Sequence, residues 1–564
     1  MPDSIDKLFD MLQHEYYHAW LRFHPETAVD VCVPEYADHL KTYDEDDIGA
    51  LIALDQKLLS ALDEMDETGL DDDRRVDFTI MGCAADIELH ALQERDWRYL
   101  NPLEFIPVHA VYQLLIHPVT DVQKAIKRRL QQIPDHLRGA RALLSRAPEL
   151  VVPVWLDSAL RQCHAGSAFI RNLGRDPLII EKFANPARLQ PQYDDAAHAL
   201  DEFASYLERD VLPHAAGDFA VGVTCFNRLL NEKHFLEIDA DAVLAFGERL
   251  FERTENELRQ LAVAMQGSDD IRSLLDKIHA IRPESAQLLD AYRKRIRDAQ
   301  HWLIDRDIVS MPPNQSLHIQ LTPKFLQPLI PFAAYEPPMV CKAEQHGLYY
   351  VTVTGDETYP REQNRFSIDL TCAHEAFPGH HLQFVTANQQ RGKNITRSVH
   401  TSASMYEGWA SYCEELMCEQ GFFDSDEHRF IMLSDRLWRA LRVIIDVKIH
   451  TGKLSAGGAA ALLIDKLGFA TSQAEAELAW YTNAPATPLC YAVGFELITA
   501  VREFEQRKPG FDLKHFHDAL LAQGSIALPL VIKQAFGEDA WRYARAQLDA
   551  GDIRVDRELC DVNH

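Results

Sequence analysis

The residues best suited to chemistry lie in one stretch, Thr371-Cys-Ala-His-Glu-Ala-Phe-Pro-Gly-His-His-Leu-Gln383. Histidine and carboxylate side chains hold zinc at catalytic sites, where three protein ligands leave one position for water. The stretch is close to H-E-x-x-H, a helical motif in which two histidines bind zinc and the glutamate acts as base. The spacing differs, because His380 follows His374 by six residues and His381 follows it by seven.

Neither spacing suits a regular helix. Residues six apart are rotated by about 600° and face different sides, whereas residues seven apart lie about 10.5 Å apart along the axis. Pro378 has no amide proton to donate to the carbonyl of His374, and Gly379 tolerates unusual dihedral angles. We therefore predict a local break at Pro378-Gly379 that returns His380 to the face of His374. His381 is the alternative ligand.

A third ligand is expected from a following helix, and the segment 405–416 offers Glu407, Glu414 and Glu415. Glu407 lies 27 residues after His380, among aromatic residues, where a buried carboxylate needs a partner such as a metal. We predict one Zn²⁺ ion bound by His374, His380 and Glu407, with Glu375 as the general base. In the alternative interpretation, Glu407 is an ordinary carboxylate at a helix N-terminus and the histidines form a surface pair.

Two tyrosines are candidates to donate a hydrogen bond to the developing oxyanion. Tyr491 is the first choice and Tyr481 the second, since a phenol can stabilise such a charge beside a metal. Either tyrosine could equally be an aromatic core residue.

Charged residues on a later helix could contact the substrate or support a ligand. Arg439 and Arg442 could hold a substrate carboxylate, or could instead pair with Asp435, Asp446 or buried glutamates. Asp446 and His450 lie four residues apart, a spacing that could orient a metal ligand from behind.

The His374-Glu-Ala-Phe-Pro-Gly-His-His-Leu-Gln stretch and Glu407-Gly-Trp-Ala together resemble a bacterial family known as domain of unknown function 885. Further matching segments are Arg439-Ala-Leu-Arg442 with Asp446 and His450, Tyr491-Ala-Val-Gly494, and Phe516-His-Asp-Ala-Leu-Leu-Ala-Gln-Gly524 with Pro529-Leu. The similarity runs from about Pro25 to the end. It implies a large, mainly helical fold of the zincin-like metallopeptidases that use a glutamate ligand. Its motif, H-E-x-x-P-G-H, ends at His380. The chain departs from the family at Ala484-Pro-Ala-Thr-Pro-Leu-Cys490, where Pro-Gly-Gln-Ala is usual before the tyrosine.

Helical periodicity dominates the sequence outside one segment. Apolar residues recur at helical spacing in the N-terminal half, which we predict to be a helical array over 1–305. The expected helices include 46–66, 72–96, 120–147, 154–172, 192–211, 238–266 and 268–306, whereas 26–36 is expected to be irregular. Strands are predicted near His318–Leu321 and in Leu348–Thr354, the best strand candidate, which could offer an edge to a peptide. A small sheet would then lie beside the active-site helix, and a central cleft is expected in a catalytic region over 306–564.

The composition limits which classes of binding partner and which cellular location are expected. The chain has 564 residues and a formal charge of −29, which excludes nucleic acid as an expected ligand because phosphate binding needs clustered positive charge. No apolar run reaches the ~20 residues of a membrane span, and no secretory signal is visible. Ten cysteines are scattered without a C-x-x-C pair, which favours free thiols, a reducing compartment and a cytoplasmic location.

The predicted activity is zinc-dependent hydrolysis of short peptides by metal-activated water. One alternative is a zinc amidohydrolase that acts on a small non-peptide substrate or a modified amino acid. Another is a catalytically silent binding protein on the same fold, although a binding module has no need of a base at Glu375.

Overall fold

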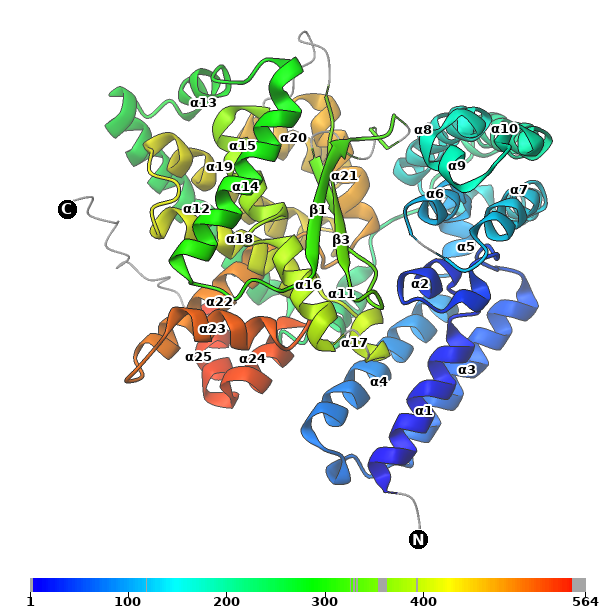
Figure 1. Ribbon diagram of the computed structural model, residues 1–564, viewed down its shortest axis with the longest axis horizontal. Coiled ribbons are helices and arrows are strands. Elements are labelled where there is room, and N and C mark those ends of the chain that lie inside the picture. The colour runs from blue at the N-terminus through cyan, green and yellow to red at the C-terminus, as the bar shows by residue number, and fades with distance from the viewer. Residues whose placement is uncertain are drawn as a thin grey trace.

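Helices make up most of the chain, and a single described sheet of three strands lies among them (Figure 1). The computed structural model describes residues 4–549 except 118, 325, 328–329, 331–332, 354–362 and 392–393. No helix within these ranges is long and apolar enough to cross a membrane.

The N-terminal helices form two packed groups. The first group packs around an apolar core of its own and consists of α1 (Ile5–Trp20), α2 (Pro25–Asp30), α3 (Glu45–Asp63) and α4 (Asp72–Glu94). The second group consists of α5 (Trp97–Leu100), α6 (Val108–Ile116), α7 (Val122–Leu144), α8 (Pro153–Asn172), α9 (Pro177–Lys182) and α10 (Gln190–Tyr206). Both groups, coloured blue to cyan, lie on one side of the sheet in Figure 1.

Two predictions for this half are wrong in detail. Segment 268–306 is two helices, α13 (Ile271–His279) and α14 (Leu288–Arg306), and Pro283 lies in the interruption, because proline removes a helical hydrogen bond. Segment 26–36 is not irregular throughout. Pro25 opens α2, where a proline fits because the first helical amide needs no partner.

The sheet has the strand order β1-β3-β2, with β1 (Gln315–Leu321), β2 (Ala333–Glu336) and β3 (Gln345–Val351). β3 pairs with β1 in parallel and with β2 antiparallel, so the predicted strand is central and cannot offer a free edge. β3 is covered on both faces. Tyr349 contacts Tyr292 of α14, and the Tyr350 hydroxyl bonds to that of Tyr112 on α6 at 2.6 Å. The apolar run that made β3 easy to predict is that of a strand buried on both faces.

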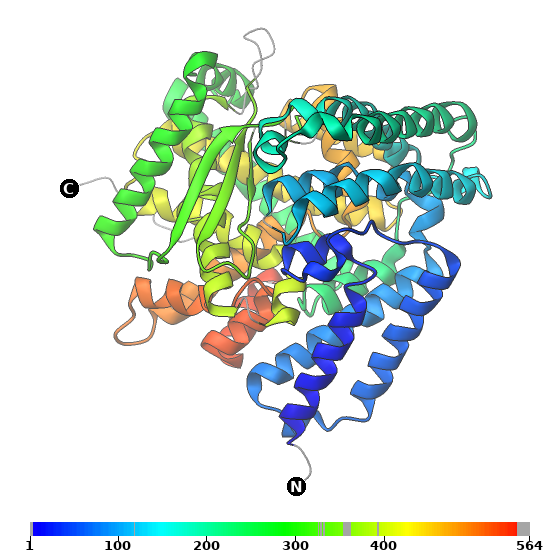
Figure 2. The ribbon, with the colours of Figure 1, turned by 45° about the vertical axis from the view of Figure 1, so that its right-hand side comes forward.

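The C-terminal part is helical again. After α11 (Gly222–Arg228) and α12 (Ala240–Gln266), the remaining helices are α15 (Arg365–Glu375), α16 (His380–Arg391), α17 (Ile395–Val399), α18 (Ala403–Glu419), α19 (Asp426–His450), α20 (Ala456–Leu467), α21 (Thr471–Asn483), α22 (Cys490–Gln506), α23 (Leu513–Leu521), α24 (Leu528–Phe536) and α25 (Glu538–Asp549). Figure 2 shows α14 and the cyan helices on opposite sides of the sheet. One apolar core joins α12 and α14 to α15, α18, α19 and α22, so helices from both predicted parts surround the His-Glu stretch.

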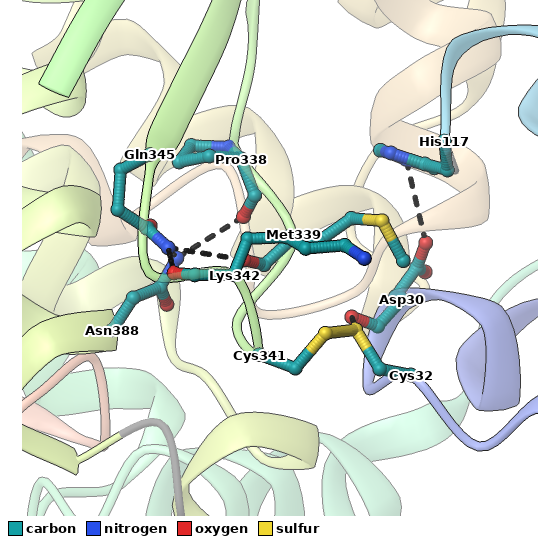
Figure 3. The surroundings of a disulfide bond; sticks show 9 residues. All are labelled: Asp30, Cys32, His117, Pro338, Met339, Cys341, Lys342, Gln345 and Asn388. Atoms are coloured by element: carbon teal, nitrogen blue, oxygen red, sulfur yellow. Dashed lines mark hydrogen bonds and ion pairs between the residues drawn. A yellow bond between two sulfur atoms is a disulfide. The ribbon is translucent and has the colours of Figure 1, made fainter. Parts of the chain in front are cut away.

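A disulfide joins Cys32, just after α2, to Cys341, in the connection between β2 and β3 (Figure 3). The prediction that all cysteines are free is therefore wrong for this pair. The two residues are 309 positions apart in sequence and their Cα atoms are 6.1 Å apart, so no local pattern could reveal them. Seven cysteines in the described ranges are free, and Cys560 lies outside those ranges. Because disulfides persist in oxidising compartments, the cysteines give no support to the expected cytoplasmic location.

Candidate metal centre

The predicted break in the His-Glu stretch is present. Helix α15 ends at Glu375 and α16 begins at His380, with Pro378 and Gly379 between them. The Gly379 amide donates to the carbonyl of Ala373 at 2.9 Å. A Cβ atom built on Gly379 would overlap the carbonyl oxygen of His374, so the chain can turn this tightly only with glycine. The break turns His380 back beside His374, and their ring centroids are 4.8 Å apart.

Helix α18 brings Glu407 to the break. The indole of Trp409 donates to the carbonyl of Pro378 at 2.9 Å, which ties α18 to the turn. On its other side α18 packs tightly against α22, because Gly408 faces Gly494 and neither position has room for a Cβ atom. This close approach places Glu407 and Tyr491, from the two helices, at one site.

The three predicted ligands are grouped at this point. One atom from each of His374, His380 and Glu407 lies within 4.8 Å of the others. The Oε2 atom of Glu407 is 3.3 Å from Nε2 of His374 and 3.4 Å from Nε2 of His380. Ligand atoms about 2.0–2.1 Å from a tetrahedral zinc ion are themselves about 3.3 Å apart. Both measured separations match that edge length.

The donor set fits a cation. Glu407 Oε2 is buried and accepts no hydrogen bond within the described part of the chain, so a positive partner would satisfy it. Burial opposes ionisation, but His380 and His374 hold the pKa of Glu407 well below its usual range. Burial also disfavours a charged His374, yet Glu407 and Glu414 raise its pKa to about 10. Two histidines and a carboxylate are a common zinc set that leaves a position for water.

Glu375 lies beside the ligands. Its Oε2 atom is 4.0 Å from Nε2 of His380, and its side chain borders the cavity described below. Burial raises the pKa of the Glu375 carboxyl, although the two histidines oppose the shift. A raised carboxyl pKa suits a group that accepts a proton and then returns it.

The carboxylate of Glu414, which the sequence offered beside Glu407 as a possible ligand, holds His374 from behind. Glu414 Oε1 accepts from Nδ1 of His374 at 2.7 Å, and Glu414 also accepts from Arg439 at 2.9 and 2.6 Å. Arg439 therefore pairs with a buried glutamate and does not face a substrate. Burial opposes ionisation of Glu414, but Arg439 and His374 lower its pKa to about 2. This arrangement leaves Nε2 of His374 free for a metal.

The two candidate tyrosines differ in position. Tyr491 borders the cavity, and its ring stacks on that of His374 with centroids 6.3 Å apart. Burial and then the charge of Glu407 raise the pKa of Tyr491 well above its usual value, so its hydroxyl stays protonated. The Tyr481 hydroxyl instead accepts from Trp438 at 3.1 Å and from Arg442 at 3.0 Å, outside the cavity lining.

The other predicted site residues lie away from the ligand atoms. His381 is held by Gln315 at 2.8 Å and by the Tyr335 hydroxyl at 3.1 Å, and burial lowers its pKa to about 3. Both of its ring nitrogens are thus occupied, whereas Nε2 of His380 lies 3.4 Å from Glu407 Oε2 in the candidate cluster.

Arg442 and the Asp446–His450 pair also have other partners. Arg442 pairs with Glu477 at 3.3 Å and lies over aromatic rings, including that of Tyr491. Asp446 accepts from the amides of Ala486 and Leu489, and His450 bonds to the carbonyl of Tyr481. Asp446 therefore holds the loop before α22 and His450 holds α21, so neither orients a candidate ligand as expected; Glu414 contacts His374 instead.

A cavity of about 580 Å³ opens beside the ligands. Helices α2 and α6 border it together with strand β2 and helices α16, α18 and α22, so both halves of the chain contribute. Tyr335 of β2 lies against His380, with ring centroids 6.4 Å apart. β2 pairs with β3 alone in the described sheet, so its outer edge is unpaired at the cavity.

Comparisons with known proteins identify a family and a fold. A family model described as "Bacterial protein of unknown function (DUF885)" matches residues 25–534. A comparison with curated proteins found no match.

Two solved structures have the same fold. One is called a "putative lipoprotein of unknown function" from Shewanella oneidensis; it is 20% identical with a TM-score of 0.75, over 93% of this chain and 99% of the other. The second is called a "putative lipoprotein" from Colwellia psychrerythraea; it is 17% identical with a TM-score of 0.78, over 97% of this chain and 99% of the other.

Proposed function

Because the chain belongs to the bacterial family of unknown function DUF885, its family assigns no activity, and we propose from its site that it is a zinc-dependent hydrolase of short peptides. The observation that carries the proposal is the position of Glu407 Oε2, 3.3 Å and 3.4 Å from the Nε2 atoms of His374 and His380. This is the edge length of a tetrahedral zinc site, and Glu375 lies beside it.

Each residue has a role that follows from its position. Zinc held by His374, His380 and Glu407 would supply a Lewis acid that lowers the pKa of water and polarises a substrate carbonyl. Glu375, 4.0 Å from the His380 ligand atom, accepts the proton of that water and returns it to the leaving amine. The protonated hydroxyl of Tyr491, beside Glu407, donates to the oxyanion that develops at the carbonyl.

The cavity favours a peptide over other acyl substrates. The outer edge of β2, which is unpaired in the described sheet, presents the backbone amide and carbonyl of alternate residues within Ala334–Glu336, which border the cavity. An extended peptide can form backbone hydrogen bonds with such an edge. A cavity of about 580 Å³ is of the size that holds a small ligand, which supports short peptides.

These features support a zincin-like fold with a central cleft. A broken helix supplies two histidine ligands and the base, a following helix supplies a glutamate ligand, and a sheet edge borders the same cavity. This combination is what the resemblance to the glutamate-ligand zincins implies.

The test is hydrolysis by the Glu375→Gln variant, combined with metal analysis. We expect wild-type protein to bind about one zinc per chain and to cleave short peptides until a chelator removes the metal. The variant should keep the zinc and lose about 10²- to 10⁴-fold or more in kcat, because only the base is changed. Elemental analysis and a panel of short peptides and acyl amides provide the measurements.

Glu344→Gln is the matched control, because Glu344 is an exposed carboxylate between β2 and β3 that lies outside the cavity lining. Full activity in the Glu375→Gln variant, or activity indifferent to chelator, would contradict the proposal. Cleavage of acyl amides but not of peptides would indicate that the protein is an amidohydrolase and not a peptidase.

A further inference from the structure

The cavity wall carries two carboxylates besides those of the metal centre. Asp30 ends α2 and Glu336 ends β2, and both border the cavity. The buried side chain of His117 points between them, with Nε2 3.7 Å from Asp30 Oδ1 and 3.7 Å from Glu336 Oε1. These separations are too long for hydrogen bonds, so both carboxylates can accept from another donor.

Asp30 is held in place from the core of the N-terminal half. The Gln113 amide nitrogen donates to Asp30 Oδ1 at 2.6 Å and to the carbonyl of Glu26 at 2.9 Å. The fully buried Arg129 in turn donates to Gln113 Oε1 at 3.4 Å. The carboxylate is therefore oriented before any ligand arrives, which reduces the entropic cost of binding.

The disulfide holds the two carboxylate-bearing segments together. Cys32 follows Asp30 by two residues, and Cys341 follows Glu336 by five. Figure 3 shows Asp30 and His117 beside the bridge. The cross-link keeps α2 of the N-terminal half next to the β2–β3 connection, so the separation between Asp30 and Glu336 is restrained.

The pair lies close to the proposed reaction centre. Glu336 directly follows Tyr335, whose ring lies against that of His380 at 6.4 Å. Successive side chains of a strand point to opposite faces, so what links Glu336 to the proposed metal ligand His380 is the cavity that both residues border.

The described cavity wall has no uncommitted arginine or lysine for a substrate carboxylate. Its one arginine or lysine is Arg397, and this side chain is paired with Asp77 at 2.8 Å and Asp73 at 3.2 Å. Away from the metal-site histidines, the described lining thus carries Asp30 and Glu336 with His109 and His117 as the nearby basic side chains and no uncommitted arginine or lysine. A negatively charged wall attracts a positively charged group.

Building on the proposed function, we propose that Asp30 and Glu336 bind the primary ammonium group of a peptide substrate and thereby determine specificity. The group is either the amino terminus or a lysine side chain, since both present the same three donors. Ammonium groups form short, strong hydrogen bonds to carboxylates.

The test uses the zinc-loaded protein and three matched peptides: one with a free amino terminus and no lysine, its N-acetylated form, and an N-acetylated form with one lysine. We expect kcat/KM to be at least about tenfold higher for one of the ammonium-bearing peptides than for the acetylated peptide without lysine, and the peptide preferred identifies the source. The double variant Asp30→Asn/Glu336→Gln should lose about tenfold or more of that preference, chiefly through KM.

Controls separate this inference from the proposed function. Glu344→Gln should retain the preference, and the single variant Glu336→Gln provides a milder test because Glu336 is partly exposed. Dissociation constants on zinc-loaded Glu375→Gln protein measure the same preference without catalysis, so an ammonium preference there would support the inference even if no bond is cleaved. Equal binding and cleavage of peptides with and without an ammonium group, or a preference unchanged in the double variant, would overturn it.

Discussion

At the scale of single residues, the two candidate tyrosines are separated by what their hydroxyls contact. The Tyr481 hydroxyl accepts from Trp438 and Arg442, so it serves the packing of α19 against α21. Tyr491 borders the cavity and lies next to Glu407. An oxyanion donor must reach the reacting atoms, which only Tyr491 can do from its position.

We therefore expect Tyr491→Phe to lower kcat by about 10²- to 10³-fold, the loss typical of one oxyanion donor, with zinc content unchanged. Tyr481→Phe is the matched control, since it removes the same atom outside the cavity and should change kcat by less than about threefold. Steady-state kinetics and elemental analysis measure both. Equal losses in the two variants would mean that the hydroxyls act through folding, and the assignment would fail.

Residue types predicted which side chains meet at the site better than they predicted the groups that support those side chains. His374, His380, Glu407 and Glu375 meet at one site, and their spacing suggested this. Glu414 follows Glu407 by seven residues, about two helical turns, so both lie on one face of α18. Asp446 and His450 have an equally suitable spacing, but sequence alone does not say which face of α19 looks toward the metal centre.

At the scale of elements, the proposed metal centre depends on the interruption between α15 and α16. We expect Gly379→Ala to displace His380, because the new Cβ would overlap the carbonyl of His374. Zinc affinity should fall by about tenfold or more, the loss seen when ligand geometry is disturbed, and activity should fall with it. Zinc titration of the metal-free protein is the measurement.

Gly49→Ala is the control for that variant, because Gly49 lies in helix α3 and has nothing within 4 Å of a built Cβ. It should leave zinc affinity unchanged and stabilise its helix slightly. If Gly379→Ala bound zinc as tightly as wild type, the close turn would not be what positions His380.

The strands were predictable to different degrees for a physical reason. β3 is buried on both faces and has a run of aromatic and β-branched residues, which is a strong signal. β2 has four partly exposed residues, Ala333–Glu336, followed by two prolines, and carries no such pattern. The edge beside the cavity is therefore β2, which local sequence does not reveal, and not the predicted β3.

At the scale of the whole molecule, contacts between segments far apart in the chain could not be predicted from the sequence. The disulfide spans 309 residues, and the cavity joins α2 and α6 to β2 and the metal-site helices. Helical periodicity indicates which face of a helix is buried but not which distant segment covers it. Helical periodicity was enough to predict a mainly helical fold. The residues that form the cavity wall could be identified only from the three-dimensional structure.

Stability of the whole molecule should depend on one buried carboxyl in the N-terminal half. Asp55 is fully buried in α3 and accepts from the Tyr16 hydroxyl of α1 at 2.9 Å. Burial and the nearby charge of Glu88 raise the pKa of Asp55 to about 8. The folded protein thus holds a proton on Asp55 that the unfolded chain, with an ordinary carboxyl, releases at much lower pH. This contribution is fully present below about pH 4 and is lost as the pH rises to about 8.

Asp55→Asn should remove that pH dependence, because the amide is neutral at every pH and its oxygen still accepts from Tyr16. The unfolding free energy of the variant relative to wild type should rise with pH between about 4 and 8, by at most about 1.4 kcal/mol per unit. Asp63→Asn, an exposed change near the end of the same helix, should leave the profile unaltered. Denaturant titrations from pH 5 to 9 measure the difference. A constant difference between Asp55→Asn and wild type across that range would show that Asp55 is already ionised in the folded protein at pH 5.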